Sequence, residues 1–391
     1  MDFDFDTPLV LRGTHSSKYD GIRATYGKDD PEMIPMWVAD MDFAAAPAIL
    51  DALQAEVSRG YMGYFTDPTL TSEAVAAWYA GRHDWNLDPR SVKYTHGVIS
   101  GYGDVIATFS EPGDSVIVFA PVYHAFYRQI RAMGREVLES ELVLRDGRFD
   151  MDLDALAGQL TGRERIMTLC SPHNPGGRIW SDDELRAVAD FCKTHDLILI
   201  ADEIHLDLVM PGSRQTPTAV AAPDALDRMV VLTAASKAFN IAGLETGLLI
   251  APDKALLKKL DRTILDRESS PNRFGMAGIR AAYEHGGLWL DAVCEYIAGN
   301  FALLEERLNA IPGTRVMPMQ ATYLAWVDFT RTGLSDEGLM SRFLDQAKVV
   351  PSPGPAFGTG GAGHLRLNIA LPRPTLLQAL DRIEDAFSDL Q

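Results

Sequence analysis

The stretch SDDELRAVADFCKTHDLILIA, from Ser181 to Ala201, places a helical pattern directly before a short run of aliphatic residues. Its first part, Ser181 to Asp196, opens with a serine and then acidic residues, the usual signal for the N-terminus of a helix. The run LILIA (Leu197 to Ala201) contains no polar residue, which is typical of a strand covered on both faces. A helix that leads into such a strand is the repeating unit of an α/β fold.

Similar aliphatic runs occur on both sides of this unit, and helical patterns separate several of them. They are SVIVF (Ser115 to Phe119), RIMTLC (Arg165 to Cys170), MVVLT (Met229 to Thr233) and GLLIA (Gly247 to Ala251). Continuous runs of this kind predict a mainly parallel sheet with helices on both faces. We therefore expect a large α/β domain over residues 46–284.

The two ends of the chain have a different pattern. The first 45 or so residues are loop-like and contain prolines, whereas a long helical pattern begins near Gly286. Two strand-like pieces, YLAWVDF and HLRLNIA, follow it, and then an amphipathic helix, TLLQALDRIEDAFSDL. Strands that follow helices suggest a second, α+β domain. If the N-terminal segment packs with it, this smaller domain is discontinuous and consists of residues 1–45 and 285–391.

The composition is that of a globular protein with an acidic surface. The net charge of the 391 residues is −18, from 36 basic and 54 acidic side chains. Such a surface repels phosphate backbones and anionic lipids, so we expect no nucleic-acid or membrane partner. The three cysteines fit neither a disulfide framework nor a zinc pattern, and the acidic N-terminus does not resemble a signal peptide. We expect a cytoplasmic protein without a metal site.

Polar side chains follow four of the predicted strands. Tyr123 comes after SVIVF, Asn174 after RIMTLC, Asp202 and His205 after LILIA, and Lys237 after MVVLT. The carboxyl ends of parallel strands share one edge of a sheet, where ligands bind in open α/β folds. We therefore expect these side chains to gather at one site.

Each of these residues alone has a simpler structural explanation. An asparagine between prolines is usually a turn residue, an aspartate after a strand is often a helix cap, and most lysines are simply exposed. Together they meet the needs of a pyridoxal phosphate site. A lysine amine bonds to the aldehyde, a carboxylate faces the pyridine nitrogen, an aromatic ring stacks on the cofactor and an amide binds its phenolic oxygen.

The segment THGVISGYGDVIATF, from Thr95 to Phe109, offers a seat for the phosphate. It has glycines at positions 97, 101 and 103 and continues as an apolar helical pattern. A glycine-containing turn that opens a helix presents free backbone N–H groups and a positive dipole end to an anion. A turn with glycines is common, so the segment supports the site only together with the other residues.

Nearly the whole chain resembles the fold-type I pyridoxal-phosphate enzymes of the aminotransferase class I/II group. Within that group it is most similar to the MalY/PatB-like cystathionine β-lyase, or C–S lyase, branch. Nine stretches carry the resemblance: RGTHSSKYD, PMWVADMDF, THGVISG, PVYHAF, SPHNPGGRIW, DEIHLD, SKAFNIAG, ATYLAW and HLRLNIALPR. The resemblance implies pyridoxal 5'-phosphate as cofactor, a small amino-acid substrate and a homodimer with shared active sites.

The resemblance also implies roles for single residues. Lys237 matches the lysine that bonds to the cofactor, and Asp202 matches the partner of the pyridine nitrogen. Further matching positions are Tyr123 for ring stacking and catalysis, Asn174 and His205 for the phenolic oxygen, and Val98, Ile99 and Ser236 for the phosphate. Substrate binding falls to Arg366, which grips the α-carboxylate, together with Asn174. Tyr64 matches a tyrosine that reaches the phosphate of the neighbouring subunit.

Three positions depart from the family pattern. Glu245 stands where many aminotransferases have a phosphate-binding arginine, so we expect it to point elsewhere, with the phosphate relying on backbone amides, Ser236, Tyr64 and Thr233. Gly177 stands where threonine is common, and His15 where aspartate is expected. These departures bear on substrate preference more than on cofactor chemistry.

The resemblance implies α,β-elimination on cystathionine or a related S-substituted cysteine, with a thiol, pyruvate and ammonia as products. The main alternative is an aminotransferase, because the two reactions share every step up to removal of the α-proton. A pyridoxal-phosphate-binding regulator with little catalysis is a second alternative, although the sequence contains no additional DNA-binding domain. The sequence does not name the substrate beyond its sulfur atom.

Overall fold

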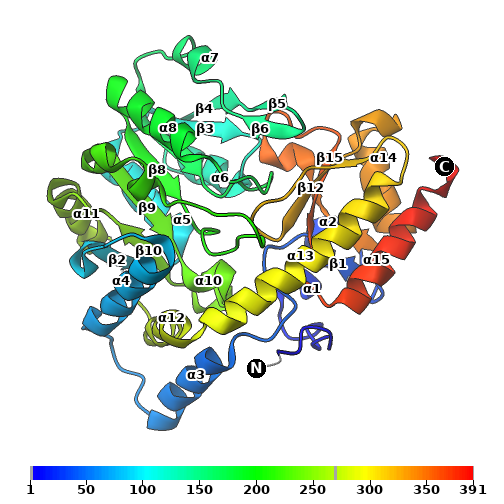
Figure 1. Ribbon diagram of the computed structural model, residues 1–391, viewed down its shortest axis with the longest axis horizontal. Helices are drawn as coiled ribbons and strands as arrows, with labels where there is room; N and C mark the ends of the chain where they lie inside the picture. Colours follow the sequence, from blue (N-terminus) through cyan, green and yellow to red (C-terminus); the bar gives the residue numbers. More distant parts are fainter. Residues whose placement is uncertain (1–2, 268–270, 391) are drawn as a thin grey trace.

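A computed structural model describes residues 3–267 and 271–390 of the protein. Seven strands form the main sheet of one lobe, in the order β2-β10-β9-β8-β7-β3-β4 (Figure 1). They are β2 (Val92–Thr95), β3 (Ser115–Ala120), β4 (Glu136–Glu141), β7 (Glu164–Cys170), β8 (Ile198–Asp202), β9 (Met229–Thr233) and β10 (Gly247–Ile250). The four strand pairs from β9 to β4 are all parallel. The predicted α/β fold with a mainly parallel sheet is therefore confirmed.

One strand runs in the opposite direction to the prediction. Strand β10 is antiparallel to both of its neighbours, β9 and β2. The connection from β9 to β10 contains only the single-turn helices α10 (Ala235–Ala238) and η3 (Ala242–Leu244). A parallel pair needs a longer crossover, usually a full helix, so the chain instead turns at the carboxyl end of β9 and runs back. This return keeps α10 at the carboxyl edge of the sheet.

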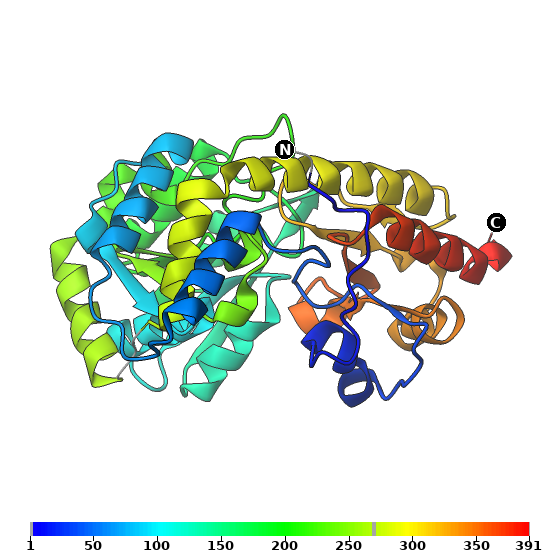
Figure 2. The ribbon, with the colours of Figure 1, turned by 90° about the horizontal axis from the view of Figure 1, so that it is seen from below.

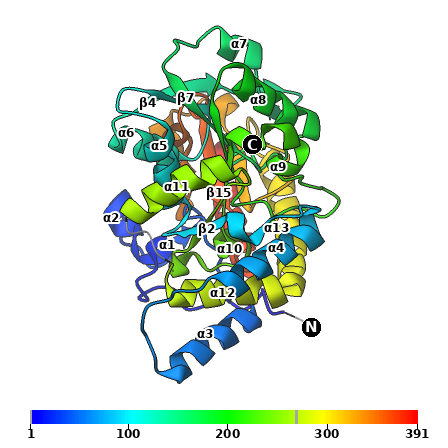
Figure 3. The ribbon, with the colours of Figure 1, turned by 90° about the vertical axis from the view of Figure 1, so that its left-hand side faces the viewer.

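Helices cover both faces of the sheet, as Figure 3 shows. Val116 and Val118 of β3 lie in one hydrophobic cluster, whereas Ile117 and Phe119 lie in the other, because successive strand residues point to opposite faces. The first cluster contains α5 (Val98–Phe109), α6 (His124–Ala132) and α11 (Lys254–Asp266). The second contains α4 (Thr69–His83), α8 (Asp182–Thr194) and α12 (Arg273–His285). Ser181 caps α8 through a capping box with Glu184, as its sequence predicts.

A smaller lobe contains a four-stranded antiparallel sheet in the order β11-β12-β15-β14. Its strands are β11 (Arg315–Val316), β12 (Leu324–Asp328), β14 (Ser352–Pro353) and β15 (His364–Asn368). Its helices are α13 (Gly287–Asn309), α14 (Asp336–Ser341) and α15 (Arg373–Ala386). In Figure 2, α13 runs along one side of the molecule and extends from the larger lobe to the smaller one.

The N-terminal segment packs with this smaller lobe. Strand β1 (Ile34–Pro35) pairs in parallel with β13 (Val349–Val350). We propose on this basis that residues 1–45 and 285–391 form one discontinuous domain and that residues 46–284 form the other. A further long helix is α3 (Pro47–Arg59), and the shorter elements are α1 (Ser17–Asp20), α2 (Ile22–Tyr26), β5 (Val143–Arg145), β6 (Arg148–Asp150), α7 (Leu153–Ala157) and α9 (Thr218–Ala221).

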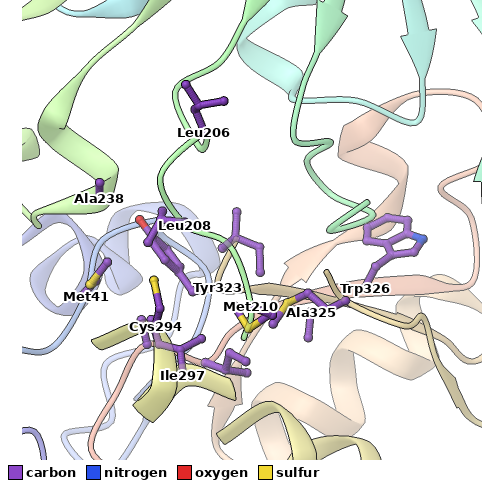
Figure 4. Packing of buried hydrophobic residues seen from close by; sticks show 14 of the residues in the cluster. Met41, Leu206, Leu208, Met210, Ala238, Cys294, Ile297, Tyr323, Ala325 and Trp326 are labelled. Atoms are coloured by element: carbon purple, nitrogen blue, oxygen red, sulfur yellow. The ribbon is translucent and has the colours of Figure 1, made fainter. Parts of the chain in front are cut away.

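The segment after β8 connects the two lobes (Figure 4). Leu206, Leu208 and Met210 are buried in the hydrophobic cluster that also contains Ile297 of α13 and Tyr323. Backbone hydrogen bonds join Leu208 to Thr322 and Met210 to Gln320, at 2.7 and 2.9 Å. The segment that carries His205 is thereby attached to the smaller sheet. Across residues 3–267 and 271–390, no helix combines the length and the apolar character that crossing a bilayer requires.

Candidate active site

A cavity of about 380 Å³ lies at the carboxyl edge of the main sheet, where β3, β7, β8 and β9 end. Because these four strands are neighbours in the sheet, the residues that follow them reach the same place. Eight of the predicted site residues line this cavity: Val98, Ile99, Tyr123, Asn174, Asp202, His205, Ser236 and Lys237. Residues that are far apart in sequence thus form one site.

Lys237 lies on α10, immediately after β9. Its Nζ donates a hydrogen bond of 2.6 Å to the carbonyl oxygen of Ala39, in the N-terminal segment. Burial lowers the pKa of Lys237 to about 8, while the nearby carboxylates of Asp40 and Asp202 act against this shift and Arg366 adds to it. A useful fraction of the amine is therefore neutral, and able to attack an aldehyde, near neutral pH.

Asp202 is the last residue of β8 and is only 3% exposed. Burial raises the pKa of its carboxyl to about 7, against a hydrogen bond from the backbone N–H of Ile204 and the positive charge of Lys237. A buried carboxylate of this kind is stabilised when a cation comes within contact distance. A protonated pyridine nitrogen is such a cation, so Asp202 fits the group that the sequence predicts.

His205 is buried beside Asp202, with 2% of its surface exposed. Burial lowers the pKa of its imidazole to about 3, so the ring is neutral at physiological pH. Its Nδ1 atom is buried and has no hydrogen-bond partner within the described part of the chain. Buried polar atoms normally have a partner, and a polar group of a bound ligand would supply one here. This orphaned atom supports a fit between the cavity and pyridoxal phosphate.

The predicted phosphate seat forms at the start of α5. Gly97 precedes the helix with a φ of 80°, a conformation that favours glycine, and the helix begins at Val98. A Cβ on Gly247 would lie 2.8 Å from the backbone nitrogen of Val98, so glycine is needed there for β10 to approach. The first N–H groups of a helix lack partners within the helix and can bind an anion.

One expectation about the phosphate seat needs correction. Thr233, expected to help bind the phosphate, donates its hydroxyl to the carbonyl oxygen of Glu203 at 3.2 Å instead. It also accepts a hydrogen bond from the Tyr79 hydroxyl of α4 at 3.3 Å, so it lies on the face of the sheet that α4 covers and is already paired. Glu245 is exposed and borders the cavity, and its expected direction away from the phosphate stays a prediction.

Arg366 lies on β15, next to the cavity but not in its lining. Its guanidinium donates to Asn174 Oδ1 at 3.1 Å, to the carbonyl oxygen of Trp37 at 2.8 Å and to Ser352 Oγ at 3.2 Å. It also lies 4.9 Å from the ring centroid of Phe357. Burial lowers the pKa of Arg366 to about 10, which still leaves it a cation. The structure thus joins the two predicted substrate-binding residues, Arg366 and Asn174.

Tyr64 is the one predicted site residue that lies away from the site within this chain. Its side chain is 98% exposed, and Arg273 donates a hydrogen bond to its backbone oxygen at 3.1 Å. The neighbouring Tyr61 and Met62 are also largely exposed, each by 58%. Its predicted role in the site of a second subunit stays a prediction.

The sequence did not single out several residues that complete the site. Ala39 lines the cavity, and its carbonyl oxygen accepts hydrogen bonds from Lys237 and from the hydroxyl of Tyr323. Trp37 and Ser352 position Arg366. The only signal for Trp37, Ala39 and Tyr323 was their place in the stretches PMWVADMDF and ATYLAW.

The family model described as aminotransferase class I and II matches residues 32–383. The chain belongs to this family. Cystathionine β-lyase PatB of Bacillus subtilis is 38% identical over 98% of this chain and 100% of its own length. Protein MalY of Escherichia coli is 34% identical over 96% of each chain. The crystal structure of a pyridoxal-phosphate-bound C–S lyase from Staphylococcus hominis, complexed with the inhibitor L-cycloserine, superposes with a TM-score of 0.93. It is 30% identical and covers 99% of this chain and 98% of that one.

Proposed function

We propose that this protein is a pyridoxal-phosphate-dependent C–S β-lyase, which cleaves cystathionine or related S-substituted cysteines to a thiol, pyruvate and ammonia. The observation that carries the proposal is the cavity that Lys237 and Asp202 share, with Arg366 and Asn174 joined beside it. The names of the similar proteins, cystathionine β-lyase and C–S lyase, support this reaction over the others of the family.

The residues of the cavity suit the cofactor. Bound pyridoxal phosphate supplies an aldehyde for the amine of the substrate and a ring that takes up electrons from its α-carbon. Asp202 would hold the proton on the ring nitrogen, and Tyr123 would pack against the ring. Asn174 and His205 would bind the phenolic oxygen. The N–H groups at the start of α5 and the Ser236 hydroxyl would hold the phosphate.

The substrate is oriented through its α-carboxylate, which the Arg366 guanidinium binds in the plane of its fork. Arginine suits this task because its planar fork makes two parallel contacts with a carboxylate. Holding the carboxylate at one fixed point aligns the Cα–H bond with Lys237. The neutral amine of Lys237 then removes the α-proton and becomes an ammonium.

Elimination completes the reaction. The electron pair from the Cα–H bond forms the Cα–Cβ double bond, and the sulfur leaves Cβ with the electrons of the Cβ–S bond. Tyr123 or the Lys237 ammonium gives the thiolate its proton. Burial raises the pKa of the Tyr123 phenol, so this hydroxyl keeps its proton until it is needed. The three-carbon fragment is released and reacts with water to give pyruvate and ammonia.

The active enzyme is a homodimer in which Tyr64 of each subunit reaches the phosphate of the other. The exposure of Tyr61, Met62 and Tyr64 in one loop supports this proposal, because large exposed apolar groups often mark an interface. We also propose a cytoplasmic location, which the three free and buried cysteine thiols support.

The test is to incubate the purified protein with cystathionine, cysteine and several S-substituted cysteines and to assay pyruvate. A lyase produces pyruvate without any added keto acid. An aminotransferase needs a keto acid and converts it to the corresponding amino acid. If every substrate were converted only in the presence of a keto acid, the proposed lyase reaction would be wrong. The assignment of the cofactor site would not be affected.

A further inference from the structure

A short N-terminal segment, which we call the strap (residues 37–43), passes beside Lys237 and is held mainly through its backbone. The carbonyl oxygens of its first five residues, 37–41, each accept a hydrogen bond from a side chain. The donors are Arg366, Asn368, Lys237, Lys18 and Asn240. None of these five contacts uses the side chain of Asp40, so that side chain can be changed without removing them.

Asp40 follows Ala39, the residue whose carbonyl oxygen accepts the hydrogen bond from Lys237. Its side chain is 32% exposed, but its Oδ1 atom is buried and has no hydrogen-bond partner among the described residues. The Nζ of Lys18 lies 3.7 Å from this oxygen and 3.0 Å from Oδ1 of Asp42. Lys18 is itself only 1% exposed. Two carboxylates thus share one buried ammonium. The segment directly after Ala39, whose carbonyl oxygen accepts the Lys237 hydrogen bond, therefore carries an excess negative charge.

Lys18 favours the charged form of the partly buried Asp40 carboxylate. Burial raises the pKa of Asp40, and the positive charges of Lys18 and Lys237 act against that shift. Asp42 accepts hydrogen bonds from Lys18 and from the Tyr19 hydroxyl, at 3.0 and 2.8 Å, which holds the ammonium in place. A buried ammonium with two acceptors is a fixed charge rather than a mobile surface group.

The other charged groups around Lys237 have different tasks. The titratable and charged groups around it come from several elements. They are Asp40 on the strap, Asp202 at the end of β8, His205 after β8, Tyr123 before α6, Tyr323 before β12, Arg366 on β15, and His96 and Glu245 in the lining of the cavity. Asp202 is the proposed partner of the ring nitrogen, and the imidazole of His205 is neutral. The positive charge of Arg366 disfavours the protonated form of Lys237. Among its neighbours, Asp40 acts most strongly to raise the pKa of Lys237.

We propose that Asp40 is a positioning residue that keeps a negative charge beside Lys237 and so stabilises the ammonium formed when Lys237 accepts the α-proton. The inference rests on the proposed function, since it takes Lys237 as the base. Asp40 touches neither substrate nor cofactor, and it acts by favouring the protonated form of the Lys237 nitrogen.

The test is a pH titration of the visible absorbance of the bound cofactor, which reports protonation of the nitrogen contributed by Lys237. In Asp40→Asn the midpoint should fall by about one pH unit, because loss of a nearby negative charge disfavours the protonated form of the nitrogen. The acid limb of the kcat/KM profile should move to lower pH by the same amount. Asp40→Glu restores the charge and should return the midpoint towards the wild-type value.

Asp42→Asn is the matched control. It removes a carboxylate from the same ammonium, so it should lower the melting temperature, but it should leave the absorbance midpoint in place. An Asp40→Asn midpoint equal to that of the wild type would overturn the inference, as would an equal shift in Asp42→Asn. If Asp40→Asn does not yield folded protein, Asp40→Ser gives the same comparison. A wild-type protein without any cofactor absorbance would instead refute the proposed function.

Discussion

Replacing Arg366 by lysine tests the substrate clamp directly. Lysine keeps the positive charge but loses the planar fork, and so it can no longer make two parallel contacts with the α-carboxylate. It also cannot reach Asn174, Trp37 and Ser352 together, as the guanidinium does at 2.8 to 3.2 Å. The charge would therefore remain in the site while its position becomes less defined.

The size of the effect follows from these contacts. A hydrogen bond to a charged group contributes about 1.5 to 3 kcal/mol, and the substitution removes one such bond to the substrate and loosens the position of the other. We expect a loss of about 2 to 4 kcal/mol in transition-state stabilisation, or roughly thirty- to a thousand-fold in kcat/KM. The absorbance of the bound cofactor should change little, because Arg366 lies outside the cavity lining.

The assay measures pyruvate release from cystathionine and from several S-alkyl cysteines, and in parallel any slow amino transfer. All of these reactions need the carboxylate held in place, so all should lose efficiency to a similar extent. Ser352→Ala is the matched control, since it removes one partner of the guanidinium and keeps the fork, and it should cost less than about tenfold. If Arg366→Lys impaired only one thioether substrate, Arg366 would recognise the side chain, and the carboxylate would bind elsewhere.

Three further predictions follow from the site. Lys237→Ala should lose the visible absorbance of the covalently bound cofactor, and an unchanged spectrum would mean that another amine holds it. Mixed dimers of inactive Lys237→Ala and Tyr64→Ala subunits should regain activity, since one of their two sites is intact; verified mixed dimers without activity would contradict shared sites. The pKa of Asp202 in the folded protein is about 7, above its ordinary value of 3.8. In the cofactor-free protein, the protonated carboxyl therefore favours the folded state fully below about pH 4. This contribution to the free energy of unfolding is lost as the pH rises to about 7. The melting temperature of cofactor-free wild type should therefore fall more between about pH 4 and pH 7 than that of Asp202→Asn. If the two melting temperatures changed equally with pH, burial would not raise the pKa of Asp202.

The sequence alone was sufficient for the residues that follow strands. Aliphatic runs predict buried strands, and the carboxyl ends of parallel strands must meet at one edge. The sequence therefore predicts that Asp202 and Lys237 lie at the same site. The start of α5 was equally predictable, because Gly97 and the apolar pattern behind it are local signals.

Only the tertiary structure could decide the direction of β10 and the course of the strap. A strand can be parallel to its neighbour only if the connection between them is long enough to cross the sheet. An aliphatic run has the same sequence pattern in a parallel and in an antiparallel strand. The strap is held by backbone carbonyl oxygens, which every residue carries. The sequence therefore contains no signal that Ala39 contacts Lys237, which lies 198 positions away. Arg366 and Asn174 likewise meet across 192 positions. Such contacts depend on the packing of two lobes, because local sequence patterns describe single elements and not the way in which those elements are brought together.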